Sequence, residues 1–307
     1  MRIKCKVYLG QIIFFSFFVF VGISCDKEEI VTVPVIEIYN LHNKTDSTAS
    51  FSTSINSNID SSFYDYGVCW STEKTPTIED KKTNKSTYIL NKKGFKISNL
   101  SPYTKYYARA YATNSAGTFY SDTISITTYG IVYDIEGNDY LTNKFDTQEW
   151  MIENMQTTRY NNNDPIPNVS NYDDWTNLTS GAYFEEMEYS DIDNILINYR
   201  IVYNWYLVND GRNVCPTGWH VPTNDEWTTL GNFIEGNTIL VKDFLDPSGL
   251  IHDNGWTIGS NLGKSVWWTP SESNDIEAWV FDAGFFLEFE LRSTLKRYGN
   301  SIRCIKD

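Results

Sequence analysis

The chain has 307 residues and a formal net charge of −14, and 41% of its residues are hydrophobic and 16% aromatic. That apolar content supports a packed core and excludes a wholly disordered chain, and the length predicts about two domains. The acidic balance, without a basic cluster, disfavours nucleic-acid binding, so we expect no nucleic-acid partner.

Residues 1–24 are predicted to form a signal peptide. A basic start, MRIKCK, precedes the apolar stretch QIIFFSFFVFVGIS, which is short for a membrane span and gives way at once to polar residues. The segment resembles a bacterial lipoprotein signal, which implies that Cys25 is lipidated and starts the mature chain. Gly22 stands where such signals usually carry leucine, so an ordinary signal peptide is the alternative.

Residues 25–34 form the expected tether and begin with the sequence CDKEE. In Bacteroidetes-type lipoproteins, a lysine followed by two acidic residues just after the cysteine resembles a signal for display on the outer surface. The resemblance implies an outer-membrane lipoprotein that faces the cell exterior and is anchored through an N-terminal lipid. A charged tether without this role is the alternative.

Cysteine use fits an oxidising compartment. Three cysteines remain once Cys5 leaves with the signal and Cys25 carries the lipid, so at most one intramolecular bridge can form. We predict a Cys215–Cys304 disulfide, which would join the loop before a helix to the last strand and contribute on the order of a few kcal/mol. The remaining Cys69 is expected to be a small buried apolar residue. A catalytic Cys215 would need a neighbouring base or a second reactive thiol.

Residues 35–128 alternate between short strand-like segments and turn residues, which predicts an all-β domain. The segment LSPYTKYYARAYATNSAG resembles the corner that leads into strand F of a fibronectin type III module, with Tyr106 placed to bond back to the backbone. The resemblance implies an immunoglobulin-like β-sandwich. The strand face that carries Tyr107 and Tyr111 is expected to be an ordinary sheet surface, with partner binding as the alternative.

Residues 129–307 are expected to form a second, acidic domain, with 11 basic and 28 acidic residues and hence a net charge of −17. Gly137, within the sequence EGN, predicts a hairpin turn. Thr223 and Glu226 have the spacing of a capping box, which predicts the start of a short amphipathic helix. His220 is expected to be structural, because no spacing typical of a metal site surrounds it.

Several motifs of this second domain occur in the order of a known family. They are DIEGNDY, WMIENM, TTRYNNNDPIPNV, WTNLTSGAYF, VYNWYLV, CPTGWHVPTNDEWTTL, VWWTPSE and SIRCIKD. In that order they resemble the Fibrobacter succinogenes major paralogous domain, which occurs in bacterial surface lipoproteins, often beside immunoglobulin-like modules. The resemblance implies an α+β C-type-lectin-like fold with twisted strands, short helices and long loops. It implies no established activity.

Two departures from related families bear on activity. Lectins that bind sugar through calcium carry Glu-Pro-Asn or Gln-Pro-Asp and then Trp-Asn-Asp, and these triplets do not occur in this sequence. The motif VPTNDEW also resembles sulfatase-activating enzymes, which employ a pair of reactive cysteines near the C-terminus. Only Cys304 is available here, so we expect neither calcium-dependent sugar binding nor an oxidase.

We predict a non-catalytic surface protein with a binding or adhesion role, whose ligand is a glycan or a host or cell-surface protein. Tryptophans can stack on sugar rings, and nearby carboxylates and amides can hydrogen-bond to hydroxyl groups. The predicted ligand-binding residues are Asp253, Asn254, Trp256, Asn261, Trp268, Glu272 and Asn274. A place in the core is the alternative for each tryptophan, and of the adjacent Trp267 and Trp268 one is expected to point inward and one outward.

Two other functions stay open. The run EEMEYSDID is dense in carboxylates (Glu185, Glu186, Glu188, Asp191 and Asp193), and a pair of them could serve a glycoside hydrolase, although charge runs usually form solvated loops. The chain could instead be a structural accessory of a surface assembly, with a calcium ion held by the acidic run. We otherwise expect no cofactor and no metal.

Overall fold

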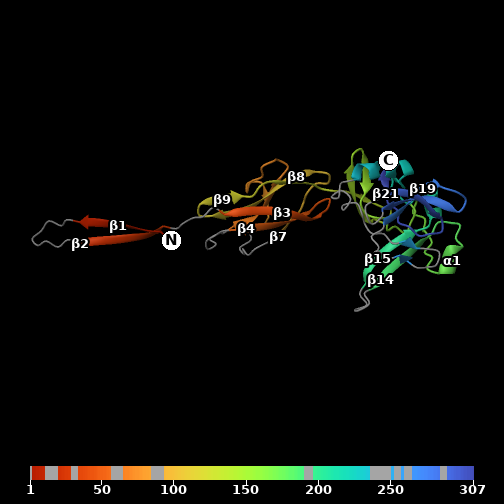
Figure 1. The fold of residues 1–307 in the computed structure, drawn as a ribbon, viewed down its shortest axis with the longest axis horizontal. Coiled ribbons are helices and arrows are strands. Elements are labelled where there is room, and N and C mark those ends of the chain that lie inside the picture. Colours follow the sequence, from red (N-terminus) through yellow and green to blue (C-terminus); the bar gives the residue numbers. More distant parts are fainter. Residues whose placement is uncertain are drawn as a thin grey trace, which may run out of the picture. The chain divides into compact units, whose positions relative to one another are not determined.

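The computed structural model of the chain divides into two compact units, Met1–Leu100 with Thr104–Thr128 and Ser101–Tyr103 with Tyr129–Asp307. Strands make up most of the regular structure, and the helices are few and short (Figure 1). The structure describes residues 2–10, 20–28, 34–56, 65–83, 93–189, 196–235, 250–251, 257–258, 265–283 and 289–307. The protein is therefore mostly β, with several separate sheets.

The first unit begins with an antiparallel hairpin of β1 (Arg2–Gly10) and β2 (Phe20–Glu28). The next sheet pairs its strands in the order β3 (Val35–Lys44), β4 (Ala49–Asn56) and β7 (Lys93–Ile97). A further sheet contains β5 (Asp65–Ser71), β6 (Lys81–Lys82), β8 (Lys105–Asn114), β9 (Gly117–Tyr120) and β10 (Ile124–Thr127).

These last two sheets enclose an apolar core. Alternate residues of β8 are buried in it, as a strand with one covered face requires, and they are Tyr106, Ala108, Ala110 and Ala112. The other sheet contributes side chains such as Phe51 and Phe95 to the same core. Two sheets packed on a shared core are consistent with the all-β sandwich that the sequence predicts.

The thiol of Cys69 is part of the packing of the first unit. Cys69 is fully buried, and its Sγ donates to the Arg109 carbonyl oxygen at 3.6 Å. Burial raises the pKa of the Cys69 thiol to about 11, so the thiol stays protonated and unreactive near neutral pH. Cys69 is thus a small buried residue, as the sequence predicts.

The largest described sheet of the second unit follows the order β11 (Gly130–Tyr133), β12 (Asp139–Phe145), β13 (Gln148–Met151), β22 (Ile305–Lys306) and β16 (Trp219–His220). The antiparallel pairing of β11 with β12 confirms the predicted hairpin. Gly137 lies in its turn with a φ of +86°, a conformation that glycine adopts without strain.

Smaller sheets and three described helices complete the second unit. The strands are β14 (Tyr183–Tyr189), β15 (Leu196–Tyr203), β17 (Leu250–Ile251), β18 (Thr257–Ile258), β19 (Ser265–Glu272), β20 (Glu277–Ala283) and β21 (Phe289–Leu295). The helices are α1 (Tyr172–Thr176), α2 (Trp205–Val208) and α3 (Asn224–Ile234). No helix in the described part of the chain is long and apolar enough to cross a membrane.

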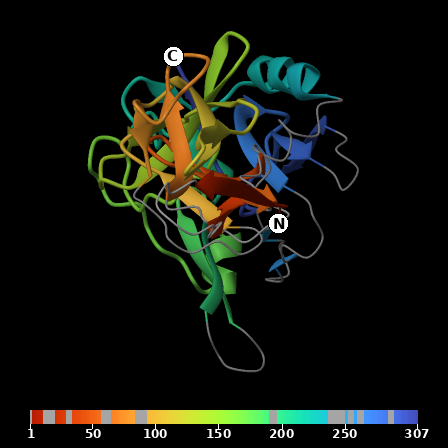
Figure 2. The ribbon, with the colours of Figure 1, turned by 90° about the vertical axis from the view of Figure 1, so that its left-hand side faces the viewer.

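Helix α3 packs against β20 and β21 and covers one face of their sheet. In Figure 2 it is the teal helix, with blue strands beside it. Its buried side chains are Trp227, Leu230 and Ile234, whereas Phe233 is 43% exposed. This spacing of apolar residues places them on one face of the helix, which is the face that meets the sheet.

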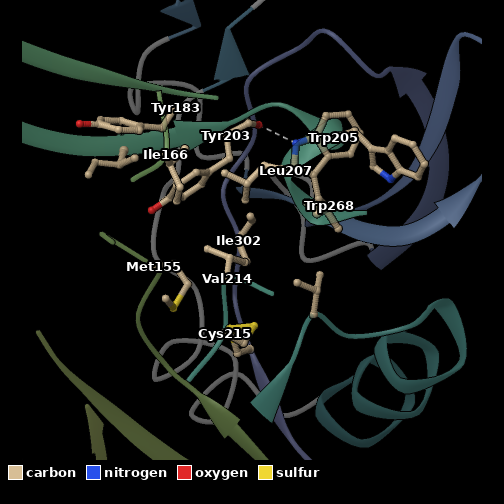
Figure 3. Close-up of a cluster of buried hydrophobic side chains, with 14 of the residues drawn as sticks. Met155, Ile166, Tyr183, Tyr203, Trp205, Leu207, Val214, Cys215, Trp268 and Ile302 are labelled. Atoms are coloured by element: carbon tan, nitrogen blue, oxygen red, sulfur yellow. Dashed lines mark hydrogen bonds between the residues drawn. A yellow bond between two sulfur atoms is a disulfide. The ribbon is translucent and has the colours of Figure 1, made fainter. Parts of the chain in front are cut away.

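The opposite face of the β19–β21 sheet contributes to another cluster of buried side chains, part of which Figure 3 shows. Trp268 of β19 lies in this cluster beside Tyr203 and Trp205, and its Nε1 donates to the Tyr203 carbonyl oxygen at 2.7 Å. Trp205 Nε1 donates in the same way to the Thr269 carbonyl oxygen at 3.0 Å. These bonds satisfy two indole N–H groups that burial removes from water.

The predicted Cys215–Cys304 disulfide is present, and both cysteines are fully buried in the cluster of Figure 3. Their Cα atoms lie 5.9 Å apart, and the residues are separated by 89 positions in the sequence. The bridge ties the loop before β16 to the segment that enters β22. The central part of the main sheet is therefore linked covalently to the segment that leads into α3.

Candidate functional site

Helix α3 begins at a complete capping box. The Thr223 hydroxyl accepts a hydrogen bond from the Glu226 backbone N–H at 3.4 Å, and the Glu226 carboxylate accepts one from the Thr223 N–H at 2.8 Å. A box of this kind satisfies backbone donors that the first turn of a helix leaves unpaired. The prediction from the sequence is confirmed, and the box fixes where α3 leaves the loop after β16.

The buried face of α3 rests on a stack of aromatic rings. The ring centroid of Trp227 lies 4.7 Å from that of Trp150 and 5.3 Å from that of Trp267. The Phe281 ring lies 4.5 Å from that of Trp227 and stacks in turn on Phe289 at 5.7 Å. Aromatic pairs at such distances add to the stabilisation from burial, so the stack holds α3 firmly against β20 and β21.

A pocket of about 130 Å³ lies at the end of this stack, beside the second half of α3, and we call it the α3 pocket. Its helical wall has residues at helical spacing, which are Thr228, Gly231, Asn232 and Glu235. Its floor comes from β20 and β21 and consists of Phe281, Phe289 and Leu291. The pocket thus combines an apolar floor with a polar wall.

Gly231 provides the space in the α3 pocket. A Cβ added to Gly231 would lie 3.5 Å from the Phe281 ring and 3.7 Å from the Phe289 Cβ, which is ordinary contact. A longer side chain would therefore extend into the pocket and fill it. Glycine in the interior of a helix destabilises it by roughly 0.5–1 kcal/mol relative to alanine, so this residue keeps the pocket open at a local cost.

The polar wall ends at Glu235, which caps the C-terminus of α3. Its backbone N–H donates to the Gly231 carbonyl oxygen at 2.9 Å. The last turn of α3 contains no basic residue. Because the C-terminal end of a helix carries partial negative charge, the Glu235 carboxylate and the helix end produce negative potential at the same edge of the pocket.

The structure corrects the prediction for the paired tryptophans of β19. Trp267 and Trp268 point to opposite faces of their sheet, as adjacent strand residues must, but both are fully buried. Trp267 meets the aromatic stack under α3, and Trp268 lies in the cluster of Figure 3. Neither face is open to solvent here, so Trp268 is a core residue and cannot stack on a ligand.

Two other predicted ligand-binding residues lie at the exposed β19–β20 turn and already have protein partners. The Glu272 carboxylate accepts a bond from Lys296 Nζ at 2.5 Å. The Asn274 side chain accepts from the Glu277 backbone N–H at 3.0 Å and donates to the Glu277 carboxylate at 3.0 Å. These bonds shape the turn, and a binding role for either residue stays a prediction.

The remaining predicted ligand-binding residues, Asp253, Asn254, Trp256 and Asn261, lie outside the described residues. Of the seven predicted residues, only Trp268, Glu272 and Asn274 are described, and these three do not form one site, because Trp268 lies in the core and the other two lie at the exposed β19–β20 turn. A role for the long loop that contains these four residues stays a prediction.

His220 is held between two carboxylates on opposite sides of its ring. Nδ1 lies 2.7 Å from Asp307 Oδ1, and Nε2 lies 3.1 Å from Glu226 Oε1. Since each ring nitrogen faces a different carboxylate, the three side chains do not converge on one point where an ion could bind. Their contacts link β16, the start of α3 and the residue after β22, which fits the structural role predicted for His220.

The structure leaves the acidic run of residues 185–193, which begins within β14, untested as a catalytic or calcium site. Glu185 is half-buried in β14, and the side chains of Glu186 and Glu188 as well as the whole of Asp191 and Asp193 are not among the described parts. Among the residues described, no group of three His, Cys, Asp or Glu side chains could hold a metal ion.

A charged cluster lies on the surface of the second unit around Arg212. Its guanidinium stacks on the Tyr160 ring at 3.7 Å and pairs with Asp210 at 2.7 Å and with Asp164 at 3.3 Å. Hydrogen bonds from Arg212 lower the pKa of Asp210 to about 2. The cluster joins the loop between β13 and α1 to the loop after α2, so the ionised form of Asp210 stabilises the folded state.

We expect this cluster to make the second unit sensitive to acid. The pKa of Asp210 is lower in the folded protein than its ordinary value of 3.8, so its stabilising effect is complete above that value and is lost as the pH falls toward about 2. Asp210→Asn should therefore flatten the loss of stability between about pH 4 and pH 2. Urea unfolding at a series of pH values, followed by tryptophan fluorescence, measures this.

The matched control for this experiment is Asp139→Asn, which removes an exposed carboxylate of β12 outside the cluster. It should leave the acid dependence of the wild type unchanged. An unchanged acid dependence in Asp210→Asn as well would contradict a role for Asp210 in acid stability.

Sequence reasoning missed the α3 pocket. Thr228, Gly231, Asn232 and Glu235 recur at helical spacing on one face of the predicted helix, with a glycine in place of a large residue, and this is a signal that could have drawn attention to the face. The residues of β20 and β21 that form the floor lie far away in the sequence, and nothing in the sequence pairs them with α3.

Comparisons with known proteins identify one part of the chain. No curated protein matches it. Residues 144–249 match the family Fibrobacter succinogenes major domain (Fib_succ_major), and the matched segment contains β13, α1, α2, β16 and α3 with its capping box. This match confirms the family that the sequence motifs indicate, and the second unit of the chain contains a Fibrobacter succinogenes major domain.

Proposed function

We propose that the protein is a surface lipoprotein with a binding or adhesion role and no catalytic activity. In this proposal a lipid on Cys25 anchors the chain in the outer membrane, facing the cell exterior. The first unit acts as a fibronectin type III-like spacer, and the second is a C-type-lectin-like head that binds a glycan or a protein. The lipoprotein-like N-terminus supports the location, and the matched family supports the kind of head.

The observation that carries the binding role is the α3 pocket. Aromatic and aliphatic side chains supply contact area at its floor, and an amide and a carboxylate lie on its wall. Ligand sites commonly combine apolar surfaces with a few polar groups that fix the orientation of the ligand. The aromatic stack beneath the pocket holds its floor in place, which lowers the entropy cost of binding.

The test is binding of the purified full-length protein, kept in detergent, to a broad array of glycans, mucins and matrix proteins, with and without calcium. We expect a reproducible signal from the wild type. Gly231→Leu should weaken this signal by at least about tenfold, or about 1.4 kcal/mol, because the leucine side chain fills the pocket. Leucine favours helix more than glycine does, so α3 should remain folded.

Gly211→Leu is the matched control, because a Cβ added at Gly211 meets no atom within 4 Å. It should bind like the wild type. A folded wild-type protein that binds nothing on the array would contradict the proposal and favour a structural role. Cleavage of polysaccharides by the same sample would support the glycoside hydrolase instead. Binding that is kept in Gly231→Leu but lost in Trp256→Ala would place the site in the segment around Trp256.

A further inference from the structure

We infer that the α3 pocket accepts a lysine side chain presented by a protein partner. The inference rests on the proposed binding function and specifies the ligand of the same site. A lysine side chain has an apolar stem of methylene groups and a positively charged end, so it needs a pocket that is apolar at the floor and negative at one edge. The α3 pocket has this arrangement.

The floor suits the stem. Phe281 and Phe289 stack their rings at 5.7 Å, and Leu291 continues the same surface. Phe281 is almost fully buried in the protein, whereas Phe289 and Leu291 are half-buried, so some of their surface stays open to a ligand. Methylene groups laid on this surface would be removed from water, which favours binding.

The edge suits the ammonium group. Glu235 and Asn232 line the pocket there, and their side chains carry a carboxylate and an amide that can interact with an ammonium group. The C-terminal end of α3 adds partial negative charge, and its last turn contains no basic residue that would neutralise it. The carboxylate and the helix end both contribute negative potential, which favours a cationic ligand and disfavours an anionic one.

The size of the pocket restricts the ligand to a group no larger than one side chain. Its volume of about 130 Å³ lies well below the range of about 300–1,000 Å³ that is typical of sites for drug-sized ligands. An oligosaccharide would leave most of its surface outside such a pocket. A single side chain that anchors a larger protein contact fits the observed volume better.

The charge of the second domain supports the same ligand class. Residues 129–307 carry 11 basic and 28 acidic residues, a net charge of −17. A field of this sign raises the encounter rate with a basic protein surface and lowers it for an acidic one. The acidic charge of the domain thus favours encounters with basic partners, and the α3 pocket determines which of their side chains binds.

The inference is tested by ligand-observed NMR on the full-length protein with Nα-acetyl-lysine amide as the probe. Nα-acetyl-norleucine amide is the comparison ligand, because it keeps the apolar stem and lacks the ammonium group. We expect saturation transfer to the lysine compound that is several-fold stronger than to the norleucine compound. Gly231→Leu should abolish the transfer to the lysine compound, whereas Gly211→Leu should not.

The charge requirement is tested with a matched pair of variants. Glu235→Gln should weaken binding of the lysine compound by about three- to fivefold, as expected for a partly exposed ion pair. Glu290→Gln makes the same change of charge on β21, but its side chain lies on the opposite face of the strand from Phe289 and Leu291. It should bind the lysine compound like the wild type.

Several results would overturn the inference. Equal binding of the norleucine compound would show that the pocket is only apolar. Equal losses in Glu235→Gln and Glu290→Gln would show that the overall acidic field attracts the probe, without a specific site. A blank with the lysine compound, from a folded sample that still binds a partner on the array, would refute the lysine pocket and leave the proposed binding function standing.

Discussion

Removal of the Cys215–Cys304 disulfide is expected to lower the free energy of unfolding by about 4–5 kcal/mol. The bridge spans 89 positions, and a cross-link over a loop of that length removes much of the conformational entropy of the unfolded chain. Without it, β22 (Ile305–Lys306) would be held between β13 and β16 by few backbone bonds. Loss of the bridge should therefore loosen the centre of the main sheet.

The measurement is equilibrium urea unfolding of the wild type and of the double variant Cys215→Ala with Cys304→Ala. Nine of the ten tryptophans lie in the second domain, so their fluorescence reports mainly on its unfolding. Reductant should lower the stability of the wild type toward that of the double variant, and it should have no effect on the double variant. A loss below about 1 kcal/mol would mean that the entropy model overstates the role of the bridge here.

Trp227→Ala is expected to lower the free energy of unfolding of the second unit by about 3–5 kcal/mol. Trp227 is fully buried, and its ring contacts Trp150, Trp267 and Phe281 within the stack under α3. Truncation to alanine would leave a large cavity that the surrounding rings can fill only in part. Because these rings also support the floor of the α3 pocket, the pocket should lose its shape as well.

Phe233→Ala is the control for this variant, since Phe233 lies on the same helix and is 43% exposed. Its effect should stay within about 0.5 kcal/mol, as is usual for surface substitutions. Unfolding in urea gives both values from the change in midpoint at a constant slope. Similar losses for the two variants would contradict the view that the stack stabilises α3.

Features with local causes were predictable from the sequence. The capping box depends on Thr223 and Glu226, which lie three positions apart, and the turn between β11 and β12 depends on Gly137. The alternation along β8 follows from the two-residue period of a strand. The disulfide could be predicted because few cysteines were left to choose from.

For the tryptophans of the predicted binding site, one part of the prediction was right and another was wrong. The alternation of Trp267 and Trp268 was predicted correctly, but the burial of both was not, because it depends on what covers each face of their sheet. Helix α3 covers one face, and the cluster around Tyr203 covers the other. A tryptophan in a strand looks the same in the sequence whether its face is covered or open.

The sequence by itself determined the all-β character of the first unit, the family of the second domain, the start of α3 and the Cys215–Cys304 disulfide. These features follow from short-range spacing, from recurring motifs or from the number of cysteines. Only the tertiary structure decided which aromatic residues form the core and where a pocket lies. The α3 pocket exists because Gly231 on a helix meets Phe281 and Phe289 on strands distant in the sequence, and such long-range packing sets burial and leaves no local pattern.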